Sequence, residues 1–121
     1  MSDPISTFFG AWEIESGDER LQQITSAVGE NIRYDDPRTP ATIRGISALN
    51  EYVGAFSANA PGWSARVVGS DTIAGVARVT VAFGGTGPDG NEITQLGQYF
   101  VETDGDLISR MVGFVGTGTV E

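Results

Sequence analysis

Two adjacent carboxylates, Asp35 and Asp36, stand directly before Pro37 and are the side chains of this sequence best placed for chemistry. They follow a short strand-like run, 31–34, which the proline brings to an end. Successive strand side chains point to opposite faces, so one carboxylate can face a cavity while the other meets solvent. The chain has no histidine and no cysteine. An inward aspartate is then the best acid–base group available, and Asp36, or failing that Asp35, is the candidate.

The charge balance of the chain argues against several classes of partner. Its 121 residues carry 16 acidic and 7 basic side chains, a net charge of −9, whereas binding to nucleic acid requires a basic surface. Without histidine or cysteine, sites for zinc, copper or iron are not expected. The run Asp104-Gly105-Asp106 lacks the remaining ligands of a calcium loop and reads as a hairpin turn. We therefore expect no nucleic acid, no metal and no cofactor.

The length fits one domain with one hydrophobic core, so a single domain over 1–121 is expected. No apolar run approaches the roughly 20 residues that cross a bilayer. The first four residues lack the basic start and apolar stretch of a signal peptide. These features predict a cytoplasmic protein with no membrane partner.

Three helices are predicted in the first half of the chain, over about 4–15, 19–28 and 46–60. Asp3-Pro4 begins the first, with aspartate as N-cap and proline at the first helical position. Asp18 is the expected cap of the second. Apolar residues recur at helical spacing in each, which predicts one buried face per helix. Those faces are Ile5, Phe8, Phe9 and Trp12; Leu21, Ile24 and Val28; and Leu49, Tyr52, Val53 and Phe56.

From Trp63 onward the apolar pattern changes to a period of two, which predicts strands. The four predicted strands cover about 63–69, 76–83, 93–102 and 107–115. Asp104-Gly105 between the last two is a strong hairpin signal. The glycine cluster at 84–90 joins two strands and has no Gly-Lys-Ser/Thr, so we interpret it as a hairpin and not as a phosphate-binding loop.

The predicted order is helix, helix, short strand, helix and then a meander of long strands. That order is typical of an α+β fold with three N-terminal helices packed on one face of a curved, mainly antiparallel sheet. A sheet that curls around helices leaves a cone, and the open end of the cone is a natural pocket.

This order of elements, with three short motifs, is similar to the NTF2-like superfamily in its SnoaL-like or ketosteroid-isomerase-like branch. The motifs are Tyr34-Asp35-Asp36-Pro37 at the end of the short strand, 43–49 at the start of the third helix and the hairpin at 104–108. The resemblance covers nearly the whole chain. It implies a cone-shaped, cystatin-like fold, a homodimer packed through the outer sheet face, and a largely apolar pocket for a small apolar molecule.

The resemblance also implies a role for Asp36, because ketosteroid isomerases keep their general base in an Asp-Pro at the end of this strand. Other parts of that machinery are not matched. The family's neutral acid would fall near Gly97, which has no side chain, and the first helix has no tyrosine to donate to an oxyanion. SnoaL-type cyclases are expected to use a histidine partner, which this chain lacks, and no second strand aspartate completes the Asp-Arg-Asp set of limonene-epoxide-hydrolase-like enzymes.

Seven further residues are the candidate ligand contacts around Asp36. They are Trp12, Tyr34, Phe56, Phe83, Gln95, Tyr99 and Arg110. Which sheet face is concave is left open by the sequence, because a shift of one residue moves every strand side chain to the other face. Two positions for Arg110 follow: it pairs with Asp36 across the pocket, or it lies on the dimer face.

Two functions fit these observations. The first is a SnoaL-like small-molecule-binding protein, an isomerase or polyketide-cyclase-like enzyme that acts on an apolar carbonyl compound with Asp36 as general base. The second is a homodimeric ligand-binding or protein-interaction module without catalysis, which the missing oxyanion donors favour. A collapsed cone with Asp36 bonded to backbone alone would favour the second.

Overall fold

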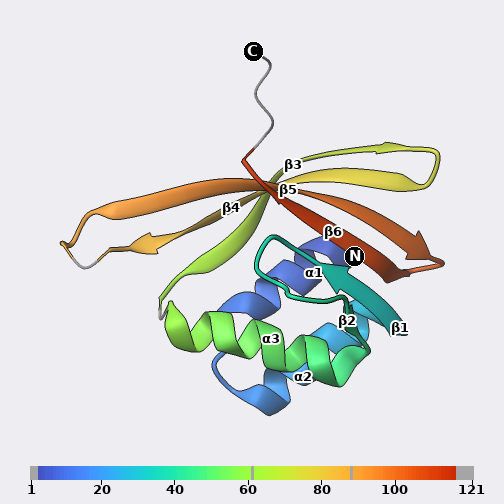
Figure 1. The fold of residues 1–121 in the computed structure, drawn as a ribbon, viewed down its shortest axis with the longest axis horizontal. Helices are drawn as coiled ribbons and strands as arrows, with labels where there is room; N and C mark the ends of the chain where they lie inside the picture. Colours follow the sequence, from blue (N-terminus) through green and yellow to red (C-terminus); the bar gives the residue numbers. More distant parts are fainter. Residues whose placement is uncertain (1–2, 61, 88, 117–121) are drawn as a thin grey trace.

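The computed structural model describes residues 3–60, 62–87 and 89–116 and has an α+β architecture (Figure 1). Its helices are α1 (Pro4–Gly10), the 3₁₀ turn η1 (Ala11–Glu13), α2 (Gly17–Ala27) and α3 (Ile46–Asn59). Its strands are β1 (Val28–Asp35), β2 (Ile43–Arg44), β3 (Ser64–Ile73), β4 (Val76–Thr86), β5 (Glu92–Asp104) and β6 (Leu107–Val115). The predicted α+β class, with three helices and one mainly antiparallel sheet, is confirmed.

The strands form one mixed sheet in the order β2-β1-β6-β5-β4-β3. Strands β1 and β6 are parallel, and every other neighbouring pair is antiparallel. The three α-helices lie on one side of the long strands (Figure 1). Alternation along β4 directs Val79 and Val81 inward, where both are fully buried, and directs Arg78 and Thr80 outward. The core therefore lies between the helices and the inner sheet face.

Helix α1 begins as predicted, since Asp3 accepts a hydrogen bond from the backbone N–H of Ile5 at 3.2 Å and Pro4 follows it. The helix stops at Gly10 and tightens into η1, so the predicted extension to residue 15 is wrong. The predicted cap of α2 is also wrong. Ser16 caps it through its hydroxyl oxygen, at 3.3 Å from the N–H of Glu19.

The segment before α3 differs from the prediction as well. Ile43–Arg44, which the predicted third helix (46–60) leaves outside and for which no strand was predicted, forms the short strand β2 along the edge of β1. Gly45 then turns the chain into α3 with a φ of 90°, a conformation that side-chain-bearing residues rarely adopt.

Three of the long strands run further than the sequence predicted, because the turns between them are short. Ala74 and Gly75 alone separate β3 from β4, and Gly105 and Asp106 alone separate β5 from β6. Residues 84–86, predicted as loop, continue β4 and pair with β5. The predicted last strand, 107–115, is confirmed.

Candidate functional site

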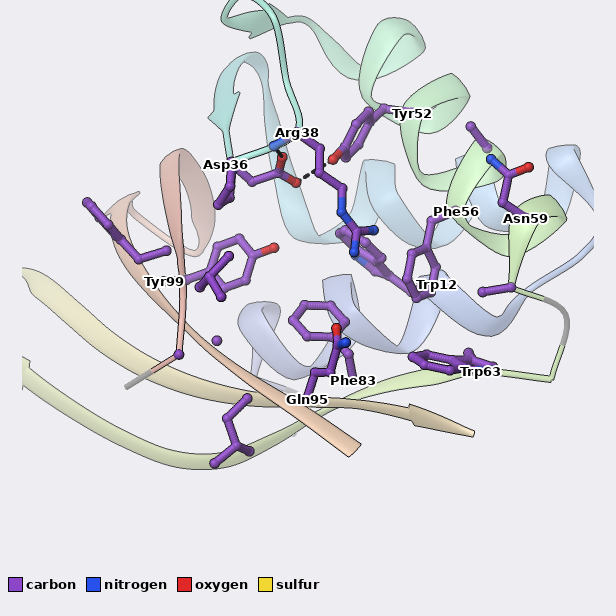
Figure 2. A pocket seen from close by; sticks show the side chains of 18 residues that line it. Trp12, Asp36, Arg38, Tyr52, Phe56, Asn59, Trp63, Phe83, Gln95 and Tyr99 are labelled. Carbon is purple, nitrogen blue, oxygen red and sulfur yellow. Dashed lines mark hydrogen bonds between the residues drawn. The ribbon is translucent and has the colours of Figure 1, made fainter. Parts of the chain in front are cut away.

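A cavity of about 710 Å³ lies between α3, the turn after β1 and the strands β4 and β5 (Figure 2). Its walls are mainly aromatic and its polar groups are few, which is the usual character of a small-molecule site. The aromatic residues of the lining are Trp12, Tyr52, Phe56, Trp63, Phe83, Tyr99 and Phe114. Asp36 is the one carboxylate among the lining residues that the structure describes.

Asp36 lies in the turn that follows β1 and closes that turn with its own side chain. Its Oδ1 accepts hydrogen bonds from the backbone N–H groups of Arg38, at 2.8 Å, and Thr39, at 3.1 Å. The hydroxyl of Thr39 accepts from the N–H of Asp36 in return, at 3.1 Å. Aspartate commonly bonds the backbone two residues on in this way, so Oδ1 has a local structural role.

The other oxygen of Asp36, Oδ2, faces two tyrosines. It accepts a hydrogen bond from the Tyr34 hydroxyl at 2.8 Å and another from the Tyr52 hydroxyl at 2.5 Å (Tyr52 is drawn in Figure 2). A carboxylate has about four accepting positions. Asp36 receives four hydrogen bonds on its two side-chain oxygens, so its accepting capacity is filled in this arrangement.

The phenols form a chain whose direction follows from proton counting. The hydroxyls of Tyr34 and Tyr99 are 2.8 Å apart, and either one could be the donor from distance alone. An ionised carboxylate only accepts, so the single proton of Tyr34 is committed to Asp36. Tyr99 must then donate to Tyr34. All three phenol protons point toward Asp36, and the oxygens keep lone pairs for anything else they meet.

Burial keeps these phenols neutral. Burial raises the pKa of Tyr34 well above its usual value, and the neighbouring Tyr99 and the charge of Asp36 raise it further. Burial likewise raises the pKa of Tyr52, with the hydrogen bond to Asp36 adding to it, and that of Tyr99. Each group resists forming a second negative charge in an apolar surrounding beside a carboxylate.

Two glycines make room for the aromatic walls. A methyl group on Gly113 would lie 2.6 Å from Cε2 of Tyr99, so the tyrosine ring rests directly on the backbone of β6. A methyl group on Gly85 would lie 2.5 Å from Cδ1 of Trp63. Gly113 thus sets the position of the Tyr99 hydroxyl, and the sequence alone carries no sign of it.

Arg38 is a second residue of the site that sequence reasoning missed. It lines the cavity, and Figure 2 shows its side chain directed inward from the turn that carries Asp36. The ion pairs among the described residues are Arg78 with Asp71 and Arg110 with Glu102, so the guanidinium of Arg38 forms none of them. Arg38 lies in a proline-rich turn, and nothing local to such a turn tells which way a long side chain points.

The structure brings most of the predicted contacts into one place. Asp36 and five of the seven candidate contacts line the cavity, those five being Trp12, Phe56, Phe83, Gln95 and Tyr99. Tyr34 is fully buried behind the lining and reaches the site through its hydrogen bonds to Asp36 and Tyr99.

Arg110 and Asp35 lie elsewhere. Met111 next to Arg110 is fully buried, so strand alternation directs Arg110 to the outer face, where it pairs with Glu102 at 3.7 Å. The alternative in which Arg110 faces Asp36 is thereby corrected. Asp35 accepts a hydrogen bond from the hydroxyl of Thr42 at 2.9 Å and does not line the cavity.

The apolar periodicity predicts Tyr52 only as part of the buried face of the third helix. Its hydroxyl was the available signal, because a tyrosine on an apolar face needs a partner for that group. Over the described ranges, we find no group of three or more acidic, histidine or cysteine side chains arranged for a metal. No helix in the described part of the chain is long and apolar enough to cross a membrane.

No protein-family model matches the chain, and no curated protein matches it either. Solved structures do resemble the chain. A SnoaL-like family protein from Agrobacterium tumefaciens strain C58, provisionally named an isomerase, superposes with a TM-score of 0.79 at 24% identity, covering 94% of this chain and 95% of its own. A protein with a ketosteroid isomerase-like fold from Catenulispora acidiphila, in complex with trimethylamine, has a TM-score of 0.76 at 11% identity, covering 96% and 87%.

A limonene-epoxide-hydrolase-like epoxide hydrolase from Mycobacterium tuberculosis has a TM-score of 0.68 at 13% identity, covering 93% of this chain and 80% of its own. Identities this low establish the fold. The fold is that of the NTF2-like superfamily in the form that SnoaL-like and ketosteroid-isomerase-like proteins share, and the resemblance predicted from the sequence is confirmed.

Proposed function

We propose that this chain is a SnoaL-like enzyme that binds a small, largely apolar carbonyl compound in the cavity and uses Asp36 as general base. The observation that carries the proposal is an aromatic cavity with a carboxylate at one end of it. The fold supports it, since similar structures include a SnoaL-like protein and one with a bound amine.

The proposed step is proton removal from the carbon next to the ligand's carbonyl group. The C–H electron pair forms the enolate double bond, the carbonyl oxygen takes the negative charge, and the proton passes to Asp36. Return of the proton to another carbon makes an isomerase, and attack of the enolate on a second carbonyl group makes a cyclase. The step requires a free lone pair on Oδ2, so one phenol must release Asp36 first. Tyr52 is the candidate, because it lines the cavity and is less buried than Tyr34.

Hydrogen–deuterium exchange into 2-tetralone tests this base without knowledge of the natural substrate. This ketone has acidic protons beside its carbonyl group, and proton NMR in D₂O follows their loss. We expect the wild type to accelerate exchange above the buffer rate. Asp36→Asn should lower the accelerated rate by about 100-fold or more, as expected for loss of a general base. Equal rates for the two proteins would end the case for Asp36.

Tyr52→Phe is the matched variant for this experiment. It leaves the carboxylate in place and removes one of the two donors to Oδ2. If Asp36 is the base, this variant should exchange the tetralone protons at least as fast as the wild type. A loss as large as that of Asp36→Asn would mean that the network is structural. Near-ultraviolet circular dichroism confirms that each variant keeps its packing.

The second candidate is a non-catalytic ligand carrier, and one observation favours it. All four hydrogen bonds to Asp36 come from the protein itself, which leaves no open accepting position for a substrate proton. Neither condition set for a carrier is fully met, however. The cavity is open, and Asp36 bonds two phenols as well as backbone. Saturable ligand binding without exchange of tetralone protons would favour the carrier.

We extend the proposal to the assembly, with the curved sheet closing a cone and its outer face packing against a second copy. That face carries Phe100, 40% exposed, and Phe114, 55% exposed, in edge-to-face contact at 5.7 Å between ring centroids. Large apolar side chains at this exposure favour a partner surface. The pairs Arg78–Asp71 and Arg110–Glu102 are also exposed.

A further inference from the structure

The polar end of the cavity is short of hydrogen-bond donors, and this matters for any ligand with an oxygen there. Tyr34, Tyr52 and Tyr99 each have one hydroxyl proton, and all three protons are committed toward Asp36. The backbone N–H groups of Arg38 and Thr39 are committed to the same carboxylate. In this arrangement the phenols present lone pairs to a ligand, and the phenol proposed to release Asp36, Tyr52, offers only a single neutral donor.

The amide donors of the lining come from other parts of the cavity. Gln95 precedes Tyr99 by four residues along β5, which corresponds to about 13 Å of strand. Asn59 follows Tyr52 by seven residues along α3, which corresponds to about 10 Å of helix. Figure 2 shows both away from the Asp36 end. Neither amide is in position to serve an oxygen held beside the phenols.

The indole N–H of Trp12 is also not exposed to the cavity as a donor, although the ring lines the wall. Its Nε1 is screened from solvent and has no hydrogen-bond partner among the described residues. The side chain is packed against other aromatic rings, including Phe56 at 4.9 Å and Phe83 at 5.6 Å between centroids. A donor that no solvent molecule touches is not available to an oxygen in the open cavity.

The second indole of the lining, that of Trp63, also lies away from the Asp36 end in Figure 2. Arg38 remains, and it is in the right place. It lines the cavity, follows Asp36 by two residues in the same turn, and forms no ion pair with a described carboxylate. Its charge acts on both cavity phenols, since it lowers the pKa of Tyr52 and of Tyr99 against the larger opposite effect of burial. A guanidinium offers five N–H donors in a planar fork that matches a carboxylate or an enolate oxygen.

We propose that Arg38 is the specificity-determining residue of the cavity, and that its guanidinium binds a carboxylate or enolate oxygen of the ligand. The assignment rests on the proposed function of the cavity and names the ligand class: an apolar body with an anionic oxygen at one end. It also supplies the charge stabilisation for which Gly97 and the first helix offer no donor. The effect is local, because the chain as a whole carries a net charge of −9 and repels anions at long range.

A pair of probes with the same apolar body tests the assignment. Calorimetric titration compares 2-naphthoate with neutral 2-naphthamide on the wild type, Arg38→Gln and Arg38→Lys. We expect the wild type to prefer naphthoate, and Arg38→Gln to weaken naphthoate binding by tenfold or more while changing naphthamide binding by less than twofold. Arg38→Lys should restore part of the loss, because lysine returns the charge without the planar fork.

Arg78→Gln is the matched control. It removes the same charge from an exposed position on the outer face, so naphthoate binding should stay within twofold of the wild type. Equal affinity for the two probes in the wild type, or an equal loss in Arg38→Gln and Arg78→Gln, overturns the assignment alone. Failure of both probes to bind the wild type overturns the assignment together with the proposed function of the cavity.

Discussion

The side chain of Asp36 makes two sets of hydrogen bonds, one through each carboxylate oxygen. Oδ1 holds the turn through two backbone N–H groups, and Oδ2 gathers the hydroxyls of Tyr34 and Tyr52. The structural role explains why an aspartate stands before Pro37. The phenols on Oδ2 have no part in that turn, and these two, of Tyr34 and Tyr52, tie the carboxylate to β1 and α3.

The three phenols of this network predict an unusual alkaline titration. The chain has three tyrosines in all, so absorbance at 295 nm reports this network and nothing else. Their pKa values are raised by burial, and we expect the folded protein to show no ordinary tyrosinate titration near pH 10. Protein unfolded in guanidinium should titrate there. Even one tyrosine that titrates near pH 10 in the folded state would contradict the network.

The same shifts predict how stability depends on pH. A group whose pKa is raised by folding stabilises the folded state fully below its unfolded pKa, near pH 10 for tyrosine. That stabilisation is lost as the pH rises from there toward the folded pKa values. Urea unfolding should therefore show a falling free energy of unfolding above about pH 10. Tyr52→Phe should make the free energy of unfolding fall less steeply with pH. An unchanged slope in that variant would show that Tyr52 does not contribute to the pH dependence.

At the scale of elements, a close packing contact positions the Tyr99 ring. Gly113→Ala places a methyl group against the ring, and overpacking of this kind costs about 1–3 kcal/mol. We expect a matching loss in the free energy of unfolding by urea. Gly69→Ala is the control, because a methyl group there would meet only Thr80, at 4.0 Å. Equal stabilities of the two variants would show that the ring yields without cost.

The hairpin between β3 and β4 carries a local strain that can be relieved. Ala74 has a φ of 51° and Gly75 a φ of 79°, as in the turns that favour Asn-Gly. Ala74→Asn should therefore raise the free energy of unfolding by about 0.5–1 kcal/mol, since asparagine adopts this conformation more easily. Ala74→Val, with a branched side chain, should lower it. Thermal and urea unfolding measure both, and a reversed order would refute the conformational reason.

Elements with strong local signals could be predicted from the sequence. Asp3-Pro4 marked the start of α1, and the alternation over 107–115 marked β6. An element could not be predicted in this way where two local signals compete, or where a contact with a distant residue decides. Ser16 and Asp18 are both good caps, and only the fold selects Ser16. Gly84 and Gly85 read as a turn, yet Gly85 continues β4 because Trp63 packs on it.

The same distinction between local signals and contacts of distant segments applies to the residues of the site. Asp36 could be placed from the sequence because its turn is local, and the aromatic walls could be predicted from apolar periodicity. The direction of Arg38 and the outward face of Arg110 depend on how distant segments meet. For Arg110 the inner face of β6 had to be known, and a shift of one residue reverses it.

At the scale of the whole molecule, the exposed outer face predicts a homodimer. Light scattering at micromolar concentration should give about twice the 12.7 kDa of one chain. Phe100→Lys places a charge in the centre of the proposed interface, twice over if the dimer is symmetric, and should give the monomer mass. Ile73→Lys, at a position 79% exposed at the end of β3, is the control and should stay dimeric. A monomeric wild type would contradict the interface.

The central claim is that the cavity between α3, β4 and β5 is a ligand site, and NMR titration tests it most directly. The chain has two tryptophans, Trp12 and Trp63, and both line the cavity. On titration with 2-naphthoate in a ¹⁵N-labelled sample, we expect saturable shifts of both indole N–H signals and of the Gln95 side-chain amide. Backbone signals of Ile73 and Asp71, at the far hairpin, should not move. Shifts confined to that hairpin or to the outer sheet face, with both indole signals unmoved at saturation, would contradict the claim.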